Sequence, residues 1–220
     1  MSTLQQIGQY AYSHTVTIQS SYDLAVHMIE NKIDGDFVEC GVAAGAQLMA
    51  MALANKDKSG DKIFWGFDSF IGIPMAGEFD DSQPAIGEIT HDKFAPLSER
   101  LISSGITAHS LESVIQNFTN YGLYSSSIHF VEGWFQDTLP LMADKIEKIS
   151  ILRLDGDLYE STLVCLEHLY PKVCKGGAVI IDDYGLTGCR IAVEHYFKSI
   201  NESVPEMICV DGHSVHYFIK

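Results

Sequence analysis

The chain has 220 residues, of which 46% are hydrophobic and 20% are charged, an ordinary balance for a globular protein that buries one core. Its formal net charge of -15 argues against nucleic acid or an anionic membrane surface as the main partner. We therefore expect a single domain over residues 1–220.

The N-terminal segment, the lack of long apolar runs and the cysteines predict a cytoplasmic protein. No apolar run approaches the length of a membrane span, and the first 14 residues lack the basic and apolar regions of a signal peptide. The five cysteines are widely spread and include no CxxC pair, which indicates reduced thiols rather than a zinc site or a disulfide framework.

Short β-rich runs alternate with helix-like segments along the chain. Strands are predicted at 36–42, 62–68, 127–133, 149–155, 177–183, 206–211 and 214–220. Helices are predicted at 22–31, 46–55, 158–169 and 192–200, where apolar residues recur every three or four positions. Ser20 is the expected N-cap of the first helix, with Asp23 three residues further on.

This alternation predicts a parallel sheet with helices on both faces. Asp211 and Gly212 lie between the last two strands and indicate a hairpin, so the final strand should run antiparallel. A seven-stranded, mostly parallel sheet with a C-terminal antiparallel hairpin is the α/β pattern of a class I methyltransferase, a Rossmann-like fold. A dinucleotide-binding Rossmann domain lacks that hairpin. Residues 71–92 show no periodicity, and we expect them to form a lid or acceptor loop.

The first strand and helix are joined by a glycine turn, "ECGVAAGAQ". Gly41 and Gly45 allow a sharp bend and a close approach of backbone to ligand, although any tight strand–helix turn also needs glycine. The spacing is not GxGxxG, so a pyrophosphate site is not supported. Glu39 at the strand end would suit a cationic group such as an amine.

The next two strands end in further candidates for nucleoside binding. Asp68 closes the second strand, where a carboxylate can accept both hydroxyls of a ribose, or can simply form a turn. Gly133, Trp134 and Phe135 follow the third strand, and the aromatic side chains there could stack on an adenine or belong to the core.

Four carboxylates follow the fourth and fifth strands: Asp155 and Asp157, then Asp182 and Asp183. Adjacent parallel strands lie about 4.8 Å apart, so these side chains should converge, and they repel one another unless a cation neutralises them. An all-oxygen set favours a hard ion, above all Mg²⁺. The alternative is a set of solvated turn residues or a cluster paired with Arg153.

With these motifs in place, the chain resembles the macrocin O-methyltransferase family, S-adenosylmethionine-dependent sugar O-methyltransferases of antibiotic biosynthesis. The matching pieces include "GDFVECGV", "FDSFIGIP", "GWFQDTLP", "LRLDGDLYEST" and "VIIDDYG", in the family's order from about residue 35 to 200. The segment before Gly35 matches poorly, so the resemblance implies no particular sugar.

The resemblance implies a role for each matching position. Asp155, Asp182 and Asp183 correspond to magnesium ligands, and Asp157 corresponds to a proposed general base. Positions that contact the cofactor are Glu39, Gly41, Asp68, Ser69, Gly133 and Trp134. The implied reaction is Mg²⁺-assisted methyl transfer from S-adenosylmethionine to a hydroxyl of a small-molecule acceptor, carried out by a homo-oligomer.

Two other classes of function compete with this interpretation. The "DGD" motif also occurs as a metal-binding DxD in phosphatases and glycosyltransferases. A phosphatase of that type has its DxD on the first strand, whereas here it follows the fourth, and such a glycosyltransferase is usually longer. The third possibility is a non-catalytic module that binds S-adenosylmethionine.

Overall fold

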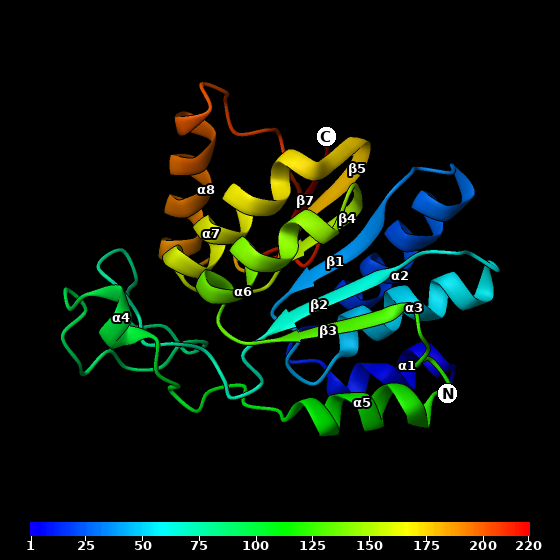
Figure 1. Cartoon of the computed structure of the whole chain (residues 1–220), viewed down its shortest axis with the longest axis horizontal. Helices are drawn as coiled ribbons and strands as arrows, with labels where there is room; N and C mark the ends of the chain where they lie inside the picture. Colours follow the sequence, from blue (N-terminus) through cyan, green and yellow to red (C-terminus); the bar gives the residue numbers. More distant parts are fainter.

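The computed structural model describes residues 1–220 and contains one seven-stranded sheet in the order β3-β2-β1-β4-β5-β7-β6 (Figure 1). The strands are β1 (Asp36–Cys40), β2 (Phe64–Asp68), β3 (Ile128–Glu132), β4 (Ile149–Leu154), β5 (Val173–Ile181), β6 (Ile208–Cys209) and β7 (His216–Ile219). β1 to β5 pair in parallel, and β7 runs antiparallel to both β5 and β6. The predicted α/β class I methyltransferase fold is therefore confirmed.

Helices cover both faces of the sheet (Figure 1). The main ones are α2 (Thr15–Glu30), α3 (Ala46–Asp57), α5 (Leu111–Asn120), α6 (Phe135–Met142), α7 (Tyr159–Leu169) and α8 (Thr187–Ser199). Shorter ones are α1 (Thr3–Ile7), α4 (Leu97–Arg100), η1 (Gly8–Tyr10), η2 (Ala143–Lys145) and η3 (Tyr170–Lys172). None of them combines the length and the apolar character that a membrane span requires.

The two faces have separate cores because successive strand residues point to opposite sides. On β1, Phe37 packs in the cluster that contains α2, α3 and α5, whereas Val38 packs in the cluster that contains α6, α7 and α8. Both side chains are fully buried. This double coverage explains why the strands appear in the sequence as nearly continuous apolar runs.

The first long helix begins earlier than predicted. α2 starts at Thr15 and follows His14, so the prediction of Ser20 as its N-cap is wrong. The reason is that Thr17, Ser21 and Gln47 form a buried hydrogen-bonded set between α2 and α3, which makes this polar stretch of α2 part of an interface. The strand predicted at 206–211 is also much shorter, because β6 contains only two residues.

A long irregular segment connects β2 to α5. It runs from 69 to 110, contains only α4 and the isolated bridge between Gln83 and Gly87, and extends beyond the predicted 71–92. It is docked on the start of α7, where the buried Asp80 side chain accepts hydrogen bonds from the backbone N–H groups of Gly77 (2.7 Å) and Tyr159 (2.9 Å). Arg100 adds a bidentate ion pair with Glu160.

Candidate active site

A pocket of about 520 Å³ lies at the carboxyl ends of the parallel strands. Open α/β sheets bind ligands at this edge, beside the point where the strand order reverses, which here is between β1 and β4. Every predicted site residue except Gly45 lines the pocket: Glu39, Gly41, Asp68, Ser69, Gly133, Trp134, Asp155, Asp157, Asp182 and Asp183.

The two glycines of the first turn serve different purposes. Gly41 has a φ of 93°, and a Cβ there would lie 1.7 Å from the carbonyl oxygen of Asp155, so this glycine lets the ends of β1 and β4 come together. Gly45 is the left-handed residue before α3, and a Cβ there would meet the ring of Phe118 at 3.0 Å. The structure therefore gives Gly45 a role in the turn and does not place it in the pocket.

Asp68 organises the glycine turn from the neighbouring strand. Its Oδ2 accepts hydrogen bonds from the N–H groups of Val42 (2.7 Å) and Ala43 (2.9 Å), and its Oδ1 accepts one from Phe70 (2.7 Å). Ser69 is likewise engaged locally, because its hydroxyl donates to the carbonyl of Gly72 at 2.6 Å. Both residues line the pocket, and their present hydrogen bonds fix its wall.

Glu39 is buried beside Arg153, which comes from the adjacent strand β4. Arg153 Nε donates to Glu39 Oε1 at 3.1 Å, and each side chain is 1% exposed. The second oxygen, Oε2, is buried and has no hydrogen-bond partner. Burial raises the pKa of Glu39 to about 8, although Arg153 acts in the opposite direction. A buried acceptor without a hydrogen-bond partner suits a ligand that supplies a hydrogen-bond donor or a positive charge.

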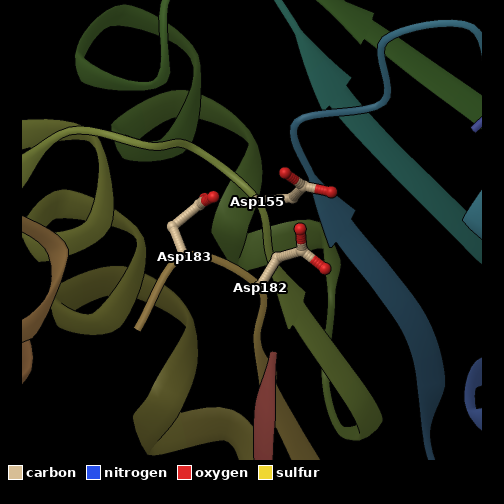
Figure 2. Close-up of side chains that lie close together, drawn as sticks. All are labelled: Asp155, Asp182 and Asp183. Atoms are coloured by element: carbon tan, nitrogen blue, oxygen red, sulfur yellow. The ribbon is translucent and has the colours of Figure 1, made fainter. Parts of the chain in front are cut away.

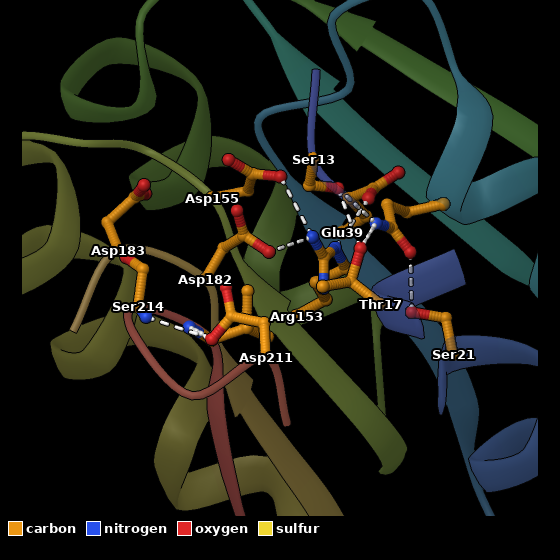
Figure 3. A network of polar contacts seen from close by, with 12 residues as sticks. Ser13, Thr17, Ser21, Glu39, Arg153, Asp155, Asp182, Asp183, Asp211 and Ser214 are labelled. Carbon is orange, nitrogen blue, oxygen red and sulfur yellow. Dashed lines mark hydrogen bonds and ion pairs between the residues drawn. The ribbon is translucent and has the colours of Figure 1, made fainter. Parts of the chain in front are cut away.

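The same guanidinium reaches the acids beyond β4 and β5 (Figure 3). Arg153 Nη2 donates to Asp155 Oδ2 at 3.0 Å and also to Asp182 Oδ1. Burial lowers the pKa of Arg153, but the adjacent carboxylates more than offset this and raise it above its ordinary value. The alternative of a cluster paired with Arg153 is thus realised in part, because two of the four acids use one oxygen each on the guanidinium.

Three carboxylates surround one small space. Asp155, Asp182 and Asp183 each offer an oxygen, and these atoms lie within 4.8 Å of one another (Figure 2). Asp157 lies outside this set and lines the pocket next to it; its backbone N–H donates to Asp183 Oδ2 at 2.8 Å. The three converging acids are those predicted to bind the metal, and the adjacent one is the predicted general base; these roles stay predictions.

These acids fit a hard divalent cation. Burial is the largest cause that raises the pKa of these carboxyl groups, and repulsion from neighbouring carboxylates is the next. The pKa values of Asp155 and Asp183 lie well above their usual range, and the pKa of Asp157 is raised to about 7. Arg153 occupies one oxygen of Asp155 and one of Asp182, which leaves the other oxygen of each for a second cation. Oxygen donors in this arrangement suit Mg²⁺.

Several pocket residues were not predicted from the sequence. Gln136, in the first turn of α6, has a buried Nε2 without a hydrogen-bond partner. Gln47 fixes the N-terminal segment at the pocket wall, because its Nε2 donates to Ser13 (3.1 Å) and Thr17 (3.0 Å), in a network seen beside the acids in Figure 3. Both glutamines lie inside stretches quoted above, "GWFQDTLP" and "ECGVAAGAQ", but only the three-dimensional structure shows their contacts.

The chain is similar to known enzymes in sequence and in fold. The family model described as Macrocin-O-methyltransferase (TylF) matches residues 16–219. The chain belongs to the macrocin-O-methyltransferase family. This member of the family is an S-adenosylmethionine-dependent O-methyltransferase, as the resemblance implies.

Curated relatives of this chain include two Streptomyces enzymes. It is 38% identical to demethyldecarbamoylnovobiocin O-methyltransferase of Streptomyces niveus over 86% of this chain and 68% of the relative. It is also 38% identical to a rhamnosyl-tetracenomycin C 4'-O-methyltransferase of Streptomyces olivaceus, over 77% of this chain and 60% of the relative. The solved structure of the O-methyltransferase NovP is similar at a TM-score of 0.79 and 34% identity, covering 96% of this chain and 82% of that one.

Proposed function

We propose that this chain catalyses Mg²⁺-assisted methyl transfer from S-adenosylmethionine to a sugar hydroxyl of a small-molecule glycoside. The observation that carries the proposal is the convergence of Asp155, Asp182 and Asp183 within 4.8 Å, beside a pocket that is also lined by Glu39, whose buried Oε2 has no hydrogen-bond partner. The sugar is favoured because the rhamnosyl-tetracenomycin relative is named for methylation of a rhamnosyl compound.

The donor side of the pocket would be formed by residues of the first three strand ends. Glu39 Oε2 would accept from the donor's ammonium group, and Asp68 would accept from the ribose hydroxyls with its remaining lone pairs. Trp134 would offer an aromatic face to the adenine. The buried Gln136 Nε2 would donate to an acceptor atom of the adenosyl group, which would give that amide the partner it lacks.

The acidic side would hold the metal and the base. Asp155, Asp182 and Asp183 would hold the cation, which when bound lowers the pKa of an acceptor hydroxyl. Asp157 would accept the hydroxyl proton, since its side chain lines the pocket and lies outside the three-carboxylate set. The acceptor oxygen then forms its bond to the methyl carbon as the carbon–sulfur bond breaks, and the sulfonium becomes the neutral thioether of S-adenosylhomocysteine. The chain's remaining task is to align oxygen, carbon and sulfur.

We also propose that the irregular segment 69–110 is the lid of this site. Ile73, Pro74, Pro84 and Ile106 from this segment line the pocket, so its closure would exclude water from the reacting atoms. The five free cysteines, three of them buried, fit the reducing cytoplasm, where we propose that the enzyme works.

Isothermal titration with S-adenosylhomocysteine, with and without Mg²⁺, tests the two binding functions. We expect binding of S-adenosylhomocysteine and no binding of a sugar nucleotide in its place, which separates the methyltransferase from a DxD glycosyltransferase or phosphatase. Asp155→Ala should bind Mg²⁺ more weakly and lose activity, whereas the exposed Asp144→Ala should match the wild type. Near-wild-type turnover of Asp155→Ala in excess Mg²⁺ would remove the metal from the mechanism.

A further inference from the structure

The pocket offers no basic side chain to the carboxylate of the methyl donor. S-adenosylmethionine carries an ammonium group and a carboxylate on the same carbon of its methionine part, so a site that binds the first must also accommodate the second. The pocket lining contains no lysine, arginine or histidine. Arg153 is not part of the lining, and only 1% of its side chain is exposed. The carboxylate must therefore be received by neutral O–H or N–H groups.

The strand order indicates where this carboxylate would lie. In the proposed arrangement the adenine lies next to Trp134 after β3, the ribose next to Asp68 at the end of β2, and the ammonium group next to Glu39 on β1. These strands follow one another as β3-β2-β1 in the sheet. Because the carboxylate shares a carbon with the ammonium group, it falls near the end of β1, on the side away from the adenine.

The start of α3 and the residues before α2 form the pocket wall that follows β1. α3 begins at Ala46, directly after the glycine turn, and both Ala46 and Gln47 line the pocket. Ser13 also lines the pocket and is attached to α3, because Gln47 Nε2 donates to Ser13 Oγ at 3.1 Å. This wall therefore offers the hydroxyl of Ser13 and the N–H groups of the first turn of α3.

The hydrogen atoms in the network around Gln47 can be assigned one by one (Figure 3). Ser21 Oγ donates to Gln47 Oε1 at 2.7 Å. The two N–H groups of the Gln47 amide donate to Ser13 (3.1 Å) and Thr17 (3.0 Å). Thr17 Oγ1 donates its only hydrogen to the carbonyl of His14 at 2.8 Å. The hydrogen in the 2.7 Å contact between the hydroxyls of Ser13 and Thr17 must therefore come from Ser13.

Ser13 is thus the hydroxyl that can turn toward a ligand without leaving another group of the network unpaired. If its hydrogen turns away, Thr17 Oγ1 still accepts from Gln47 and still donates to the carbonyl of His14. Ser13 Oγ also continues to accept from Gln47, and this hydrogen bond polarises the O–H group of Ser13.

The other serine and threonine hydroxyls of the pocket are less suited to this role. Ser69 and Thr107 each donate to a backbone carbonyl of their own segment, at 2.6 and 2.7 Å. Ser161 belongs to the acidic side, because a Cβ on Gly156 would lie 3.1 Å from Ser161 Cβ. Ser13 is therefore the side chain of this kind that remains for the carboxylate at the end of β1.

We infer that the Ser13 hydroxyl, held in place by Gln47, donates a hydrogen bond to the carboxylate of the methyl donor. The inference rests on the proposed function and adds to it a cofactor-binding residue that lies outside the strand ends. The first turn of α3 assists, because its N-cap, Gly45, makes no side-chain cap and the N–H groups of this turn have no partner within the helix. A carboxylate accepts stronger hydrogen bonds than a neutral group does.

Binding of the methyl donor would then fasten the N-terminal segment. Ser13 directly precedes His14 and α2, and its neighbour Tyr12 bonds His109 near the end of the lid segment at 2.7 Å. A carboxylate on Ser13 thus supports two connected walls of the pocket, the N-terminal segment and the lid. We expect the methyl donor to bind before the lid closes over an acceptor.

A pair of ligands that differ only in the carboxylate tests the inference. S-adenosylhomocysteine and its decarboxylated analogue, adenosylthiopropylamine, both keep the adenosyl and ammonium groups. Isothermal titration of the Mg²⁺-saturated wild type, at one pH, should show about tenfold or more tighter binding of S-adenosylhomocysteine. Ser13→Ala should lose most of this preference, whereas its affinity for the analogue should stay at the wild-type value.

Two further variants complete the comparison. Ser13→Thr keeps the hydroxyl and should restore the preference for S-adenosylhomocysteine. Ser20→Ala is the matched control, because Ser20 lies on α2 outside this pocket, and it should keep the preference in full. A purely structural role of Ser13 would weaken both ligands equally, so the ratio of the two affinities separates ligand binding from packing.

Hydrogen exchange provides a second measurement. The amides of Ala11 and Thr17 donate to the carbonyls of Gly8 (3.2 Å) and His14 (3.0 Å), so their exchange reports on the N-terminal segment. In the wild type, saturating S-adenosylhomocysteine should slow this exchange more than the saturating analogue does. In Ser13→Ala this difference between the two ligands should disappear.

The failures of the inference and of the proposed function are distinguishable. The inference is wrong if the wild type binds the two ligands equally, or if Ser13→Ala keeps the wild-type preference. It is also wrong if both ligands protect the N-terminal segment to the same extent. If S-adenosylhomocysteine does not bind the wild type, the proposed function fails, and the inference that rests on it fails as well.

Discussion

Arg153 Nε lies 3.1 Å from Glu39 Oε1, and through its Nη2 the same guanidinium also contacts Asp155 and Asp182. One buried cation therefore joins the proposed donor side of the pocket to the proposed metal side. Removal of Arg153 would take away the positive charge that pairs with these three carboxyl groups in a site shielded from water. Arg153 is thus expected to hold the geometry of both halves at once.

Replacement of Arg153 by methionine should destabilise the protein by about 3–5 kcal/mol, because it breaks a buried ion cluster on one side only. Urea denaturation measures the free energy of unfolding. Lys148→Met is the matched control, since the Lys148–Asp34 pair is exposed and its loss should leave the denaturation midpoint unchanged. Equal stability of Arg153→Met and the wild type would show that the guanidinium does not neutralise the cluster.

Binding of S-adenosylhomocysteine should be linked to a proton on Glu39. The pKa of this carboxyl is about 8 in the free protein, whereas a bound ammonium group favours the ionised form. Below pH 8 the free protein carries the proton and the complex does not, so binding releases it and affinity rises with pH. Titrations at about pH 5.5 to 7, where the ligand's amino group stays protonated, should show this rise.

The number of protons released comes from calorimetry in two buffers with different ionisation enthalpies. We expect a value approaching one for the wild type near about pH 6 and none for Glu39→Gln, which should also bind more weakly. An affinity that is flat over this range, with no release, would mean that Glu39 does not contact the ligand's ammonium group.

Substitution of Gly41 by alanine should disrupt the site through the backbone. The new Cβ would lie 1.7 Å from the carbonyl oxygen of Asp155, which forces the ends of β1 and β4 apart. Gly105→Ala is the control, because Gly105 also has a positive φ (78°) but a Cβ there meets nothing within 4 Å. The control should cost about 1–2 kcal/mol of strain, and Gly41→Ala should cost clearly more. Similar thermal stability of the two variants would contradict the close approach.

The sheet and the acids could be predicted because they follow from local pattern. Strands buried on both faces appear as apolar runs, and the carboxyl ends of adjacent parallel strands share an edge. That is enough to bring Asp155, Asp182 and Asp183 together without knowledge of any side-chain contact.

The sequence suggests Arg153 as a partner of these acids only as an alternative, and it does not show which acids Arg153 contacts. Arg153 lies inside an apolar strand run, and its pairing with Glu39 depends on the register between β1 and β4, where the two residues are direct neighbours. Gln136 and Gln47 depend on how α6 and α3 are placed. The irregular segment extends beyond the predicted range because its order comes from docking by Asp80 and Arg100, contacts that leave no periodic signal.

Asp157→Asn should separate chemistry from binding. Asp157 has a positive φ of 58°, which asparagine tolerates better than alanine, so the amide variant keeps the backbone while losing the base. We expect kcat to fall by about 10²–10⁴-fold on the best glycoside acceptor, with S-adenosylhomocysteine binding changed little. Turnover close to that of the wild type would assign the proton to another group.

Asp80→Ala should loosen the lid, and it also removes one of the charges that raise the pKa of the proposed base Asp157. Asp80 is buried, and its side chain caps the start of α7 by accepting a hydrogen bond from the N–H group of Tyr159. It also lies against α8, because a Cβ on Gly188 would be 1.8 Å from Asp80 Oδ1. Loss of this cap should cost about 0.5–2 kcal/mol. Hydrogen exchange of residues 71–110 should accelerate and KM for the acceptor should rise, whereas the exposed neighbour Asp81→Ala should change neither. Unchanged exchange in Asp80→Ala would mean that other contacts, such as the Arg100–Glu160 pair, are sufficient to hold the lid closed.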